Sequence, residues 1–215
     1  ARTNHHHENF LNKWWGLSYP REDMISKLNK LPRYIACGRV TKRPIFVFLS
    51  ASIRPNDALQ VFTYSDDYSF GILQSSLHWM WFKERCSTLK SDFRYTSNTV
   101  FDSFPWPQRA SKKDIEAVAS ASRSLLEVRN KLREGHPVSL RNLYRTLEKP
   151  GKNVLKDAHV ALDLAVERAY GMKSGIGPLK FLLDLNSELH LLEEAGKSIV
   201  GPGVPETYDD PDGLV

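Results

Sequence analysis

Two prolines flank a tryptophan in the stretch FPWP at residues 104–107, and this stretch divides the sequence into two parts with different patterns. Proline fixes its own φ angle and lacks a backbone N–H, so helices and central strands do not continue through such a stretch. Short β-rich runs such as RYIACGRV, IFVFLS and ALQVFTYS precede it, whereas apolar residues recur every three to four positions after it. The change of period predicts an α+β fold, with a small mixed sheet and packed helices followed by an all-α helical bundle. We expect a first unit over residues 1–107, the bundle over residues 108–200, and a tail over residues 201–215 that is flexible or laid on a surface.

The two parts also differ in charge and in aromatic content. Residues 1–109 carry 15 Lys and Arg against 9 Asp and Glu, while residues 110–215 carry 15 against 16. The first part also holds 19 of the 23 aromatic residues, including all five tryptophans. A basic, aromatic unit beside a neutral helical one is typical of a module that binds a polyanion, with chance clustering on an ordinary surface as the alternative.

The sequence argues against several classes of protein. Its 215 residues are 41% hydrophobic and 26% charged, as in ordinary globular proteins. It contains no apolar run of about 18 residues, so we expect no membrane partner and a cytoplasmic setting. Cys37 and Cys86 lie far apart, which disfavours a disulfide framework and a structural zinc site. The motifs of P-loops, dinucleotide folds, nucleophile elbows and H-E-x-x-H zinc sites are all missing.

The histidines and acids that could support catalysis have simpler explanations. His78 lies in the apolar run DDYSFGILQSSLHWMWFKERC, for which we predict one long buried helix with one of the aspartates at 66–67 as its N-cap. We expect His78 to be a partly buried, hydrogen-bonded helix residue, and the histidines at 5–7 to be a solvated terminal run rather than a metal site. Ser111, followed by Asp114, predicts the start of the first bundle helix.

The charged residues between positions 33 and 54 are all basic, and they alternate with β-branched and aromatic residues on predicted strands and turns. Phosphate contacts from Lys and Arg supply most of the affinity for nucleic acid, although a charge run is also compatible with a solvated face. We expect DNA backbone or groove contacts from Arg33, Arg39, Lys42, Arg43 and Arg54.

Lys90, Asp92 and Arg94 occupy alternate positions in the stretch KSDFR. On an extended backbone, residues two apart face the same side, so these three side chains would project together while Phe93 faces the core. Arg and Lys match the acceptors of guanine in the major groove, and Asp accepts from the amino group of cytosine. The spacing favours base readout by Lys90, Asp92 and Arg94, with an exposed polar edge as the alternative.

Several stretches resemble the C-terminal part of the MmeI-like family, the type IIL restriction-modification proteins. These single chains carry nuclease, adenine methyltransferase and DNA-recognition parts. The most specific stretches are the tryptophan pair at 14–15, the FGIL run at 70–73, and the R-Y-T…V-F…F-P-W-P stretch that ends at Pro107. The resemblance covers roughly residues 8–170, and implies a target-recognition domain followed by a helical C-terminal domain. Specificity residues of the family occupy alternating positions just before the R-Y-T motif, and the KSDFR stretch matches that spacing.

The resemblance further implies two partners, double-stranded DNA and the methyltransferase domain of a larger protein. That protein would use AdoMet to methylate the exocyclic amino group of adenine. The sequence contains no N-P-P-[YF] tetrad, no AdoMet-binding glycine motif and no nuclease signature, and it begins without Met. We therefore expect an excised C-terminal piece that recognises DNA, with no catalytic residue, metal or cofactor of its own. Further backbone contacts are predicted on the bundle from Lys112, Lys113, Arg141 and Arg145.

Two other functions are compatible with the sequence. An RNA- or single-strand-binding module would expose aromatic side chains for stacking on bases, but Trp79, Trp81 and Phe82 lie in a helix of core-like pattern. A protein-interaction adapter built on the helices would leave the basic strands unexplained. Binding of duplex DNA, single strands and RNA at two salt concentrations discriminates among the three.

Overall fold

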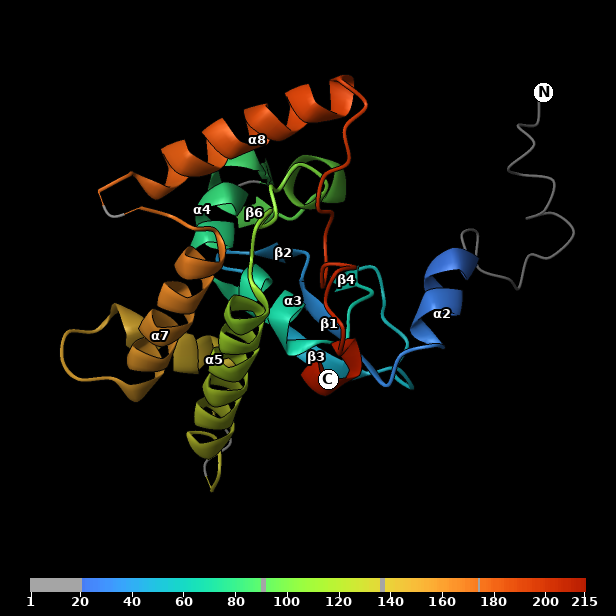
Figure 1. The fold of residues 1–215 in the computed structure, drawn as a ribbon. Coiled ribbons are helices and arrows are strands. Elements are labelled where there is room, and N and C mark those ends of the chain that lie inside the picture. Colours follow the sequence, from blue (N-terminus) through green and yellow to red (C-terminus); the bar gives the residue numbers. More distant parts are fainter. Residues whose placement is uncertain (1–20, 90–91, 136–137, 174) are drawn as a thin grey trace, which may run out of the picture.

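The strands of the first half of the chain lie beside helices from both halves (Figure 1). The computed structural model describes residues 21–89, 92–135, 138–173 and 175–215, so the tryptophan pair at 14–15, the histidines at 5–7 and Lys90 lie outside the described residues. The described elements are α2 (Glu22–Leu28), β1 (Arg33–Gly38), β2 (Val40–Thr41), β3 (Val47–Ser50), β4 (Leu59–Phe62), α3 (Asp67–Gln74), α4 (Ser76–Arg85), β5 (Ser87–Leu89), β6 (Asp92–Arg94), a π-helix (Ser97–Phe101), α5 (Lys112–Lys131), α6 (Leu140–Arg145), a 3-10 helix (Thr146–Glu148), α7 (Val154–Ala169), α8 (Pro178–Glu194) and a last 3-10 helix (Pro211–Leu214).

The α+β class that the sequence predicts is confirmed, and the described strands pair antiparallel in two small sheets instead of one mixed sheet. Sheet A has the order β3-β1-β4, and sheet B has the order β2-β6-β5. The chain passes from one to the other at Arg39, whose N–H donates to the carbonyl of Ala58 at 2.8 Å. The Arg39 carbonyl accepts from the N–H of Tyr95, also at 2.8 Å. The pairing partner thus changes within one residue, which separates the strands into two sheets.

The long helix predicted after residues 66–67 is in fact two helices. Asp66 caps α3 as predicted, because its carboxylate accepts from the N–H of Ser69 at 2.6 Å. Ser75 then adopts an extended conformation, with ψ 161°. Its Oγ donates to the carbonyl of Ile72 at 2.7 Å and accepts from the N–H of His78 at 3.3 Å. The prediction of one helix is wrong because a serine hydroxyl that bonds the neighbouring backbone both ends α3 and caps α4.

One hydrophobic core runs through both predicted units. α3 packs on α5, and α5 packs on α7. The closest approach is at Gly71 of α3, where a Cβ would lie 2.4 Å from Ser122 Oγ and 2.6 Å from a Val118 methyl carbon, so this contact requires glycine. Trp81 and Trp106, from either side of the π-helix, belong to the same core. The division at residue 107 stays a prediction of the sequence, since the core continues across it.

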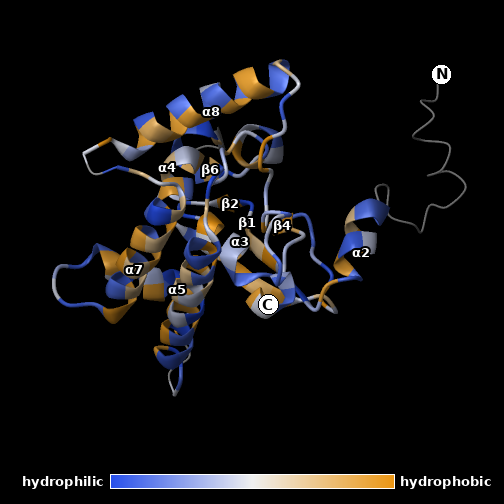
Figure 2. Cartoon of the chain, viewed as in Figure 1, coloured by the Kyte–Doolittle hydropathy of each residue, from blue (hydrophilic) through white to orange (hydrophobic). Residues whose placement is uncertain are grey.

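The first helix of the second half begins where the sequence predicts. Ser111 and Asp114 form a capping box at the start of α5, with the Asp114 carboxylate accepting from the Ser111 N–H at 3.0 Å. Gly171 follows α7 with φ +64°, a left-handed conformation that glycine adopts without steric penalty. Figure 2 shows hydrophobic and hydrophilic residues interspersed along α5, α7 and α8, as in helices with one buried face. Among the described residues, no helix is long and apolar enough to cross a membrane.

The last residues of the chain lie along the body. The backbone of Val200 exchanges two hydrogen bonds of 2.9 Å with the side chain of Gln108. Gly203 lies against the ring of Tyr64, and Leu214 is 2% exposed. These contacts hold the tail against the body of the chain.

Candidate nucleic-acid interface

Sheet B presents one face to solvent. Residues directly opposite each other on antiparallel strands share a face. Arg94 of β6 lies opposite Val40 of β2 and Ser87 of β5. All three are exposed, Val40 by 44%. These residues define the outer face of sheet B.

Phe93 fixes the orientation of β6. Its ring meets Trp79 and Phe82 edge-on, with centroid distances of 6.1 and 5.8 Å. Because successive side chains of a strand alternate between its faces, Asp92 and Arg94 project on the outer face. Asp92 is half-buried, and its buried Oδ1 accepts no hydrogen bond from any residue in the described ranges. The structure therefore brings two of the three predicted base-reading residues together.

The turn after β2 places two of the predicted phosphate contacts next to sheet B. Thr41 Oγ1 donates to the carbonyl of Arg43 at 2.8 Å, which holds the turn closed around Lys42. The Lys42 side chain is exposed. The guanidinium carbon of Arg43 lies 5.9 Å from the ring centroid of Trp79 and 5.5 Å from that of Tyr144. Both cations thus lie at the border between sheet B and the helices.

Arg33, in contrast, is held inside the body. Its guanidinium donates to the carboxylate of Asp67 at 2.9 Å and to the carbonyl of Ser65 at 2.9 Å. It also lies 3.7 Å from the ring centroid of Phe48. The Asp67 side chain is 2% exposed and accepts from Arg123 of α5 at 3.0 Å as well. Arg33 therefore compensates the charge of a buried carboxylate. For this reason we leave Arg33 out of the proposed interface.

The other two predicted arginines are also set apart. Arg39 is half-buried, and its Nε is buried without a hydrogen-bond acceptor among the described residues. Arg54 is exposed near the end of α2, where it donates to Asn29 Oδ1 at 2.7 Å. The outer face of sheet B therefore gathers Asp92, Arg94 and the adjoining turn, but not Arg54.

Two cations that the sequence analysis did not single out lie in the last turn of α4. Lys83 Nζ lies 5.4 Å from the ring centroid of Trp79, and the guanidinium carbon of Arg85 lies 4.8 Å from that of Trp81. Each cation follows its tryptophan by four residues, a spacing that places side chains on the same face of a helix. The signal is therefore present in the stretch WMWFKER, although cations in a last helical turn are also favoured by the helix dipole.

The cations predicted on the bundle are exposed. Lys112 forms an ion pair with Asp209 of the terminal segment at 2.9 Å. Lys113, Arg141 and Arg145 lie on the surface of α5 and α6. Contact with DNA stays a prediction for these four residues.

His78 is a core residue, as the sequence indicates. It is fully buried, and its Nε2 shares a hydrogen bond of 3.0 Å with the Tyr95 hydroxyl. Burial lowers the pKa of His78 to about 3, so the ring is neutral at physiological pH. A buried neutral imidazole of this kind has no access to a substrate.

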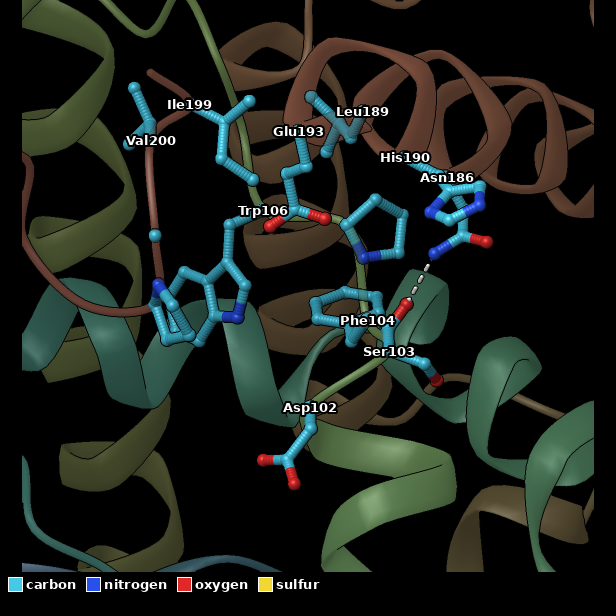
Figure 3. A pocket seen from close by; sticks show the side chains of 13 residues that line it. Asp102, Ser103, Phe104, Trp106, Asn186, Leu189, His190, Glu193, Ile199 and Val200 are labelled. Atoms are coloured by element: carbon cyan, nitrogen blue, oxygen red, sulfur yellow. Dashed lines mark hydrogen bonds between the residues drawn. The ribbon is translucent and has the colours of Figure 1, made fainter. Parts of the chain in front are cut away.

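A pocket of about 390 Å³ lies between the segment after the π-helix, α8 and the chain that follows α8 (Figure 3). Asn186 donates to the carbonyl of Ser103 at 2.8 Å in its wall. Asp102 and Glu193 contribute carboxylates to the lining, which disfavours a phosphate ligand. We assign this pocket no part in DNA binding.

Comparisons with known proteins identify similar sequences and a similar fold. Residues 41–108 match the family described as MmeI, target recognition domain, and residues 108–192 match MmeI, C-terminal domain. Over 125 residues the chain is 35% identical to DNA methyltransferase A of Bacillus subtilis (strain 168). The matched region covers 57% of this chain and 13% of that protein. The fold of this chain is similar to that of the Type IIL restriction-modification enzyme MmeI in complex with DNA, with a TM-score of 0.66. That match has 24% identity and covers 74% of this chain and 22% of the other.

The chain thus spans a small part of the length of both relatives. The two family matches follow each other directly and meet at residue 108, and they confirm the resemblance noted in the sequence. The chain therefore belongs to the MmeI family and carries its target recognition domain followed by its C-terminal domain.

Proposed function

We propose that this chain recognises a specific sequence in double-stranded DNA, as the recognition module of a restriction-modification DNA methyltransferase. The observation that carries the proposal is the orientation of β6. Phe93 packs into the core, so Asp92 and Arg94 project on the outer face of sheet B, where Arg94 is exposed and Asp92 is half-buried. Family membership supports the same function.

The chemistry of β6 suits the edges of a G·C base pair. The Arg94 guanidinium can donate two hydrogen bonds to O6 and N7 of guanine. Asp92 can accept from the amino group of cytosine through its carboxylate. A small β-sheet of this kind fits a major groove that is about 12 Å wide. We include Lys90 as a third reading residue on the basis of its spacing in the sequence.

Lys42 and Arg43 supply the contacts that bind without reading sequence. Both follow β2, which pairs with β6, so a duplex that reaches Arg94 would bring its backbone near them. Such contacts release counterions and make affinity fall with salt. They position the sheet on the duplex while β6 reads the bases.

The larger enzyme, in this proposal, transfers a methyl group from AdoMet to the exocyclic amino group of adenine. The name of the Bacillus subtilis relative, DNA methyltransferase A, supports a methyltransferase. We assign AdoMet to the methyltransferase domain of that enzyme, which would be the protein partner of this chain. This function places the enzyme in the cytoplasm, with the DNA.

Recognition of RNA or single strands is less well supported, because the candidate stacking residues are covered. Trp81 and Phe82 are fully buried. Trp79 stacks on Phe82 at 5.4 Å and 19°, and the cations of Arg43 and Lys83 lie over its ring. These aromatic side chains serve the core rather than unpaired bases.

A binding experiment tests the proposal. We expect the chain to bind duplex DNA more tightly than single-stranded DNA or RNA, with an affinity that falls as salt rises. Lys42→Ala should weaken binding to all duplexes alike and reduce the salt slope by about one. Lys27→Ala, at an exposed lysine of α2, is the matched control and should change neither quantity. Equal or tighter binding of single strands would refute duplex recognition.

A further inference from the structure

The ring of Trp79 carries two cations from different segments of the chain. The guanidinium carbon of Arg43, from the turn after β2, lies 5.9 Å from the ring centroid, and Nζ of Lys83, from α4, lies 5.4 Å from it. The ring itself is fixed between Phe82, on which it stacks, and Phe93, which meets its edge. Cations held over an aromatic face lose less conformational freedom when they bind an anion.

The helical unit completes this arrangement through Tyr144 of α6. The ring centroid of Tyr144 lies 5.5 Å from the guanidinium carbon of Arg43. Its hydroxyl accepts from buried Arg129 and shares a hydrogen bond of 3.0 Å with His159 Nε2. Burial, together with the charges of Arg129 and Arg43, lowers the pKa of His159 to about 3, so the neutral ring can accept a hydrogen bond from the Tyr144 hydroxyl. Tyr144 is thereby fixed in the position that confines Arg43.

The charges in this region are not balanced by carboxylates. None of Arg43, Lys83 or Arg129 has a carboxylate within 4.0 Å among the described residues. Arg129 donates instead to neutral acceptors, the carbonyl of Phe46 at 2.8 Å and Gln74 Oε1 at 2.6 Å, in addition to the tyrosine. This excess of positive charge favours an anionic ligand.

Burial raises the pKa of the Asp163 carboxyl on α7, and the charge of Arg43 opposes part of that rise. Asp163 Oδ1 accepts from the N–H of Ser76 at 2.7 Å, so this carboxylate is engaged at the start of α4. It offsets part of the charge of Arg43 and leaves the exposed ammonium of Lys83 unpaired in the described structure.

From this geometry we infer that the DNA-binding surface extends to Lys83, which is held on Trp79 beside Arg43 and binds phosphate groups of the duplex backbone together with it. The inference rests on the proposed function and extends it to α4 and to the helical unit. Arg43 is half-buried between Trp79 and Tyr144, and Lys83 is exposed, so the two present a cationic surface rather than an enclosed cavity. A polymer of phosphates suits such a surface better than a small anion does, because small ligands bind in concave sites.

The experiment measures binding of a labelled duplex of arbitrary sequence by the full chain at several salt concentrations. Lys83→Gln removes the charge from an exposed residue, and we expect binding to weaken about eightfold near 0.1 M salt. Each phosphate contact contributes a slope of about 0.9 to the plot of log affinity against log salt, which gives this factor over the tenfold change from 1 M to 0.1 M salt. Lys83→Arg should keep the affinity and the salt slope of the original chain, because it keeps a cation over the ring of Trp79. Arg43→Gln with Lys83→Gln should reduce the slope by about two.

Lys27→Gln makes the same change of charge on α2, which lies far from α4 in Figure 1, and should leave binding unchanged. Thermal unfolding of each variant confirms that it is folded. Suppose that Lys83→Gln binds as the original chain does while Lys42→Gln binds more weakly. The lysine then only covers Trp79 with its apolar stem, and the inference is overturned while the proposed function stands. Absence of duplex binding by the original chain would overturn both.

Discussion

The side chains on the outer face of β6 differ in hydrogen-bonding capacity, and this decides which base each can read. A carboxylate only accepts, whereas the side chains of Lys and Arg only donate. In the proposed readout, Lys90, which precedes β6, donates to guanine while Asp92 accepts from the cytosine of the same pair, which would favour one orientation of a G·C pair. Arg94 would then read a neighbouring guanine with its two-pronged guanidinium.

Exchange of the donor at position 90 and the acceptor at position 92 should reverse the orientation of the preferred base pair. Lys90→Glu with Asp92→Arg places the acceptor first, and we expect the full-length enzyme to prefer C·G where it preferred G·C. Each good base contact contributes roughly 1–3 kcal/mol of discrimination, which is enough to change the methylated site. Sequencing of methylated positions in genomic DNA measures the change.

The matched control reverses a pair of charges on α7, Lys156→Glu with Asp157→Arg, where both residues are exposed. It should leave the methylated sequence as it was. If the β6 exchange also leaves the sequence unchanged at normal activity, Lys90 and Asp92 form only a surface ion pair. Such a pair contributes about 0–1 kcal/mol and no specificity.

Gly71 lies where two helices approach too closely for a larger residue. Gly71→Ala should destabilise the protein by about 1–3 kcal/mol, because the new methyl group would overlap Ser122 and Val118. Urea unfolding measures the loss. Gly201→Ala is the control, since its Cβ would meet nothing within 4 Å and its φ lies outside the left-handed region. Equal stabilities for the two variants would show that the helices can separate without cost.

Single-residue predictions succeed where the determinant is local. The caps at Asp66 and Ser111 depend on residues three positions away, and the alternation around Phe93 depends on its immediate neighbours. Arg33 could not be assigned in this way. Its partner Asp67 lies 34 residues along the chain, and it shares that carboxylate with Arg123 of a different unit. Tertiary contacts decide which cations remain available to a ligand.

The secondary structure elements follow the same distinction. The existence of the strands and helices is evident from apolar spacing, and α5 begins after Ser111 as predicted. The division into two sheets could not be predicted, because it arises when Arg39 exchanges one pairing strand for another. The break between α3 and α4 was missed because serine is compatible with a helix interior and also with a cap.

Loss of the hydroxyl at the break should weaken the junction of α3 and α4. Ser75→Ala removes both the cap of α4 and a bond to the end of α3, and we expect a loss of about 0.5–2 kcal/mol in unfolding free energy. Ser187→Ala removes a hydroxyl from an exposed position inside α8 and should have little effect. A stable Ser75→Ala variant would mean that packing alone sets the break.

The whole molecule should unfold as one unit, because the core continues across the FPWP stretch. All five tryptophans precede residue 108, so their fluorescence reports on the first unit, whereas circular dichroism at 222 nm is dominated by helices of both units. We expect the two signals to give the same midpoint in thermal unfolding. Separate midpoints would show that α3 and α5 can part while each unit remains folded.

The alternation at Phe93 has a consequence for how such proteins diverge over generations. The phenylalanine supports the core, while the codons on either side of it specify side chains that point away from the core. A library randomised at positions 92 and 94 should therefore keep its melting temperature across most amino acids, whereas position 93 should tolerate only large apolar ones. Mutations at the two outer positions are then nearly neutral for folding, so the DNA sequence that is recognised can drift by single-codon steps without passing through unfolded intermediates.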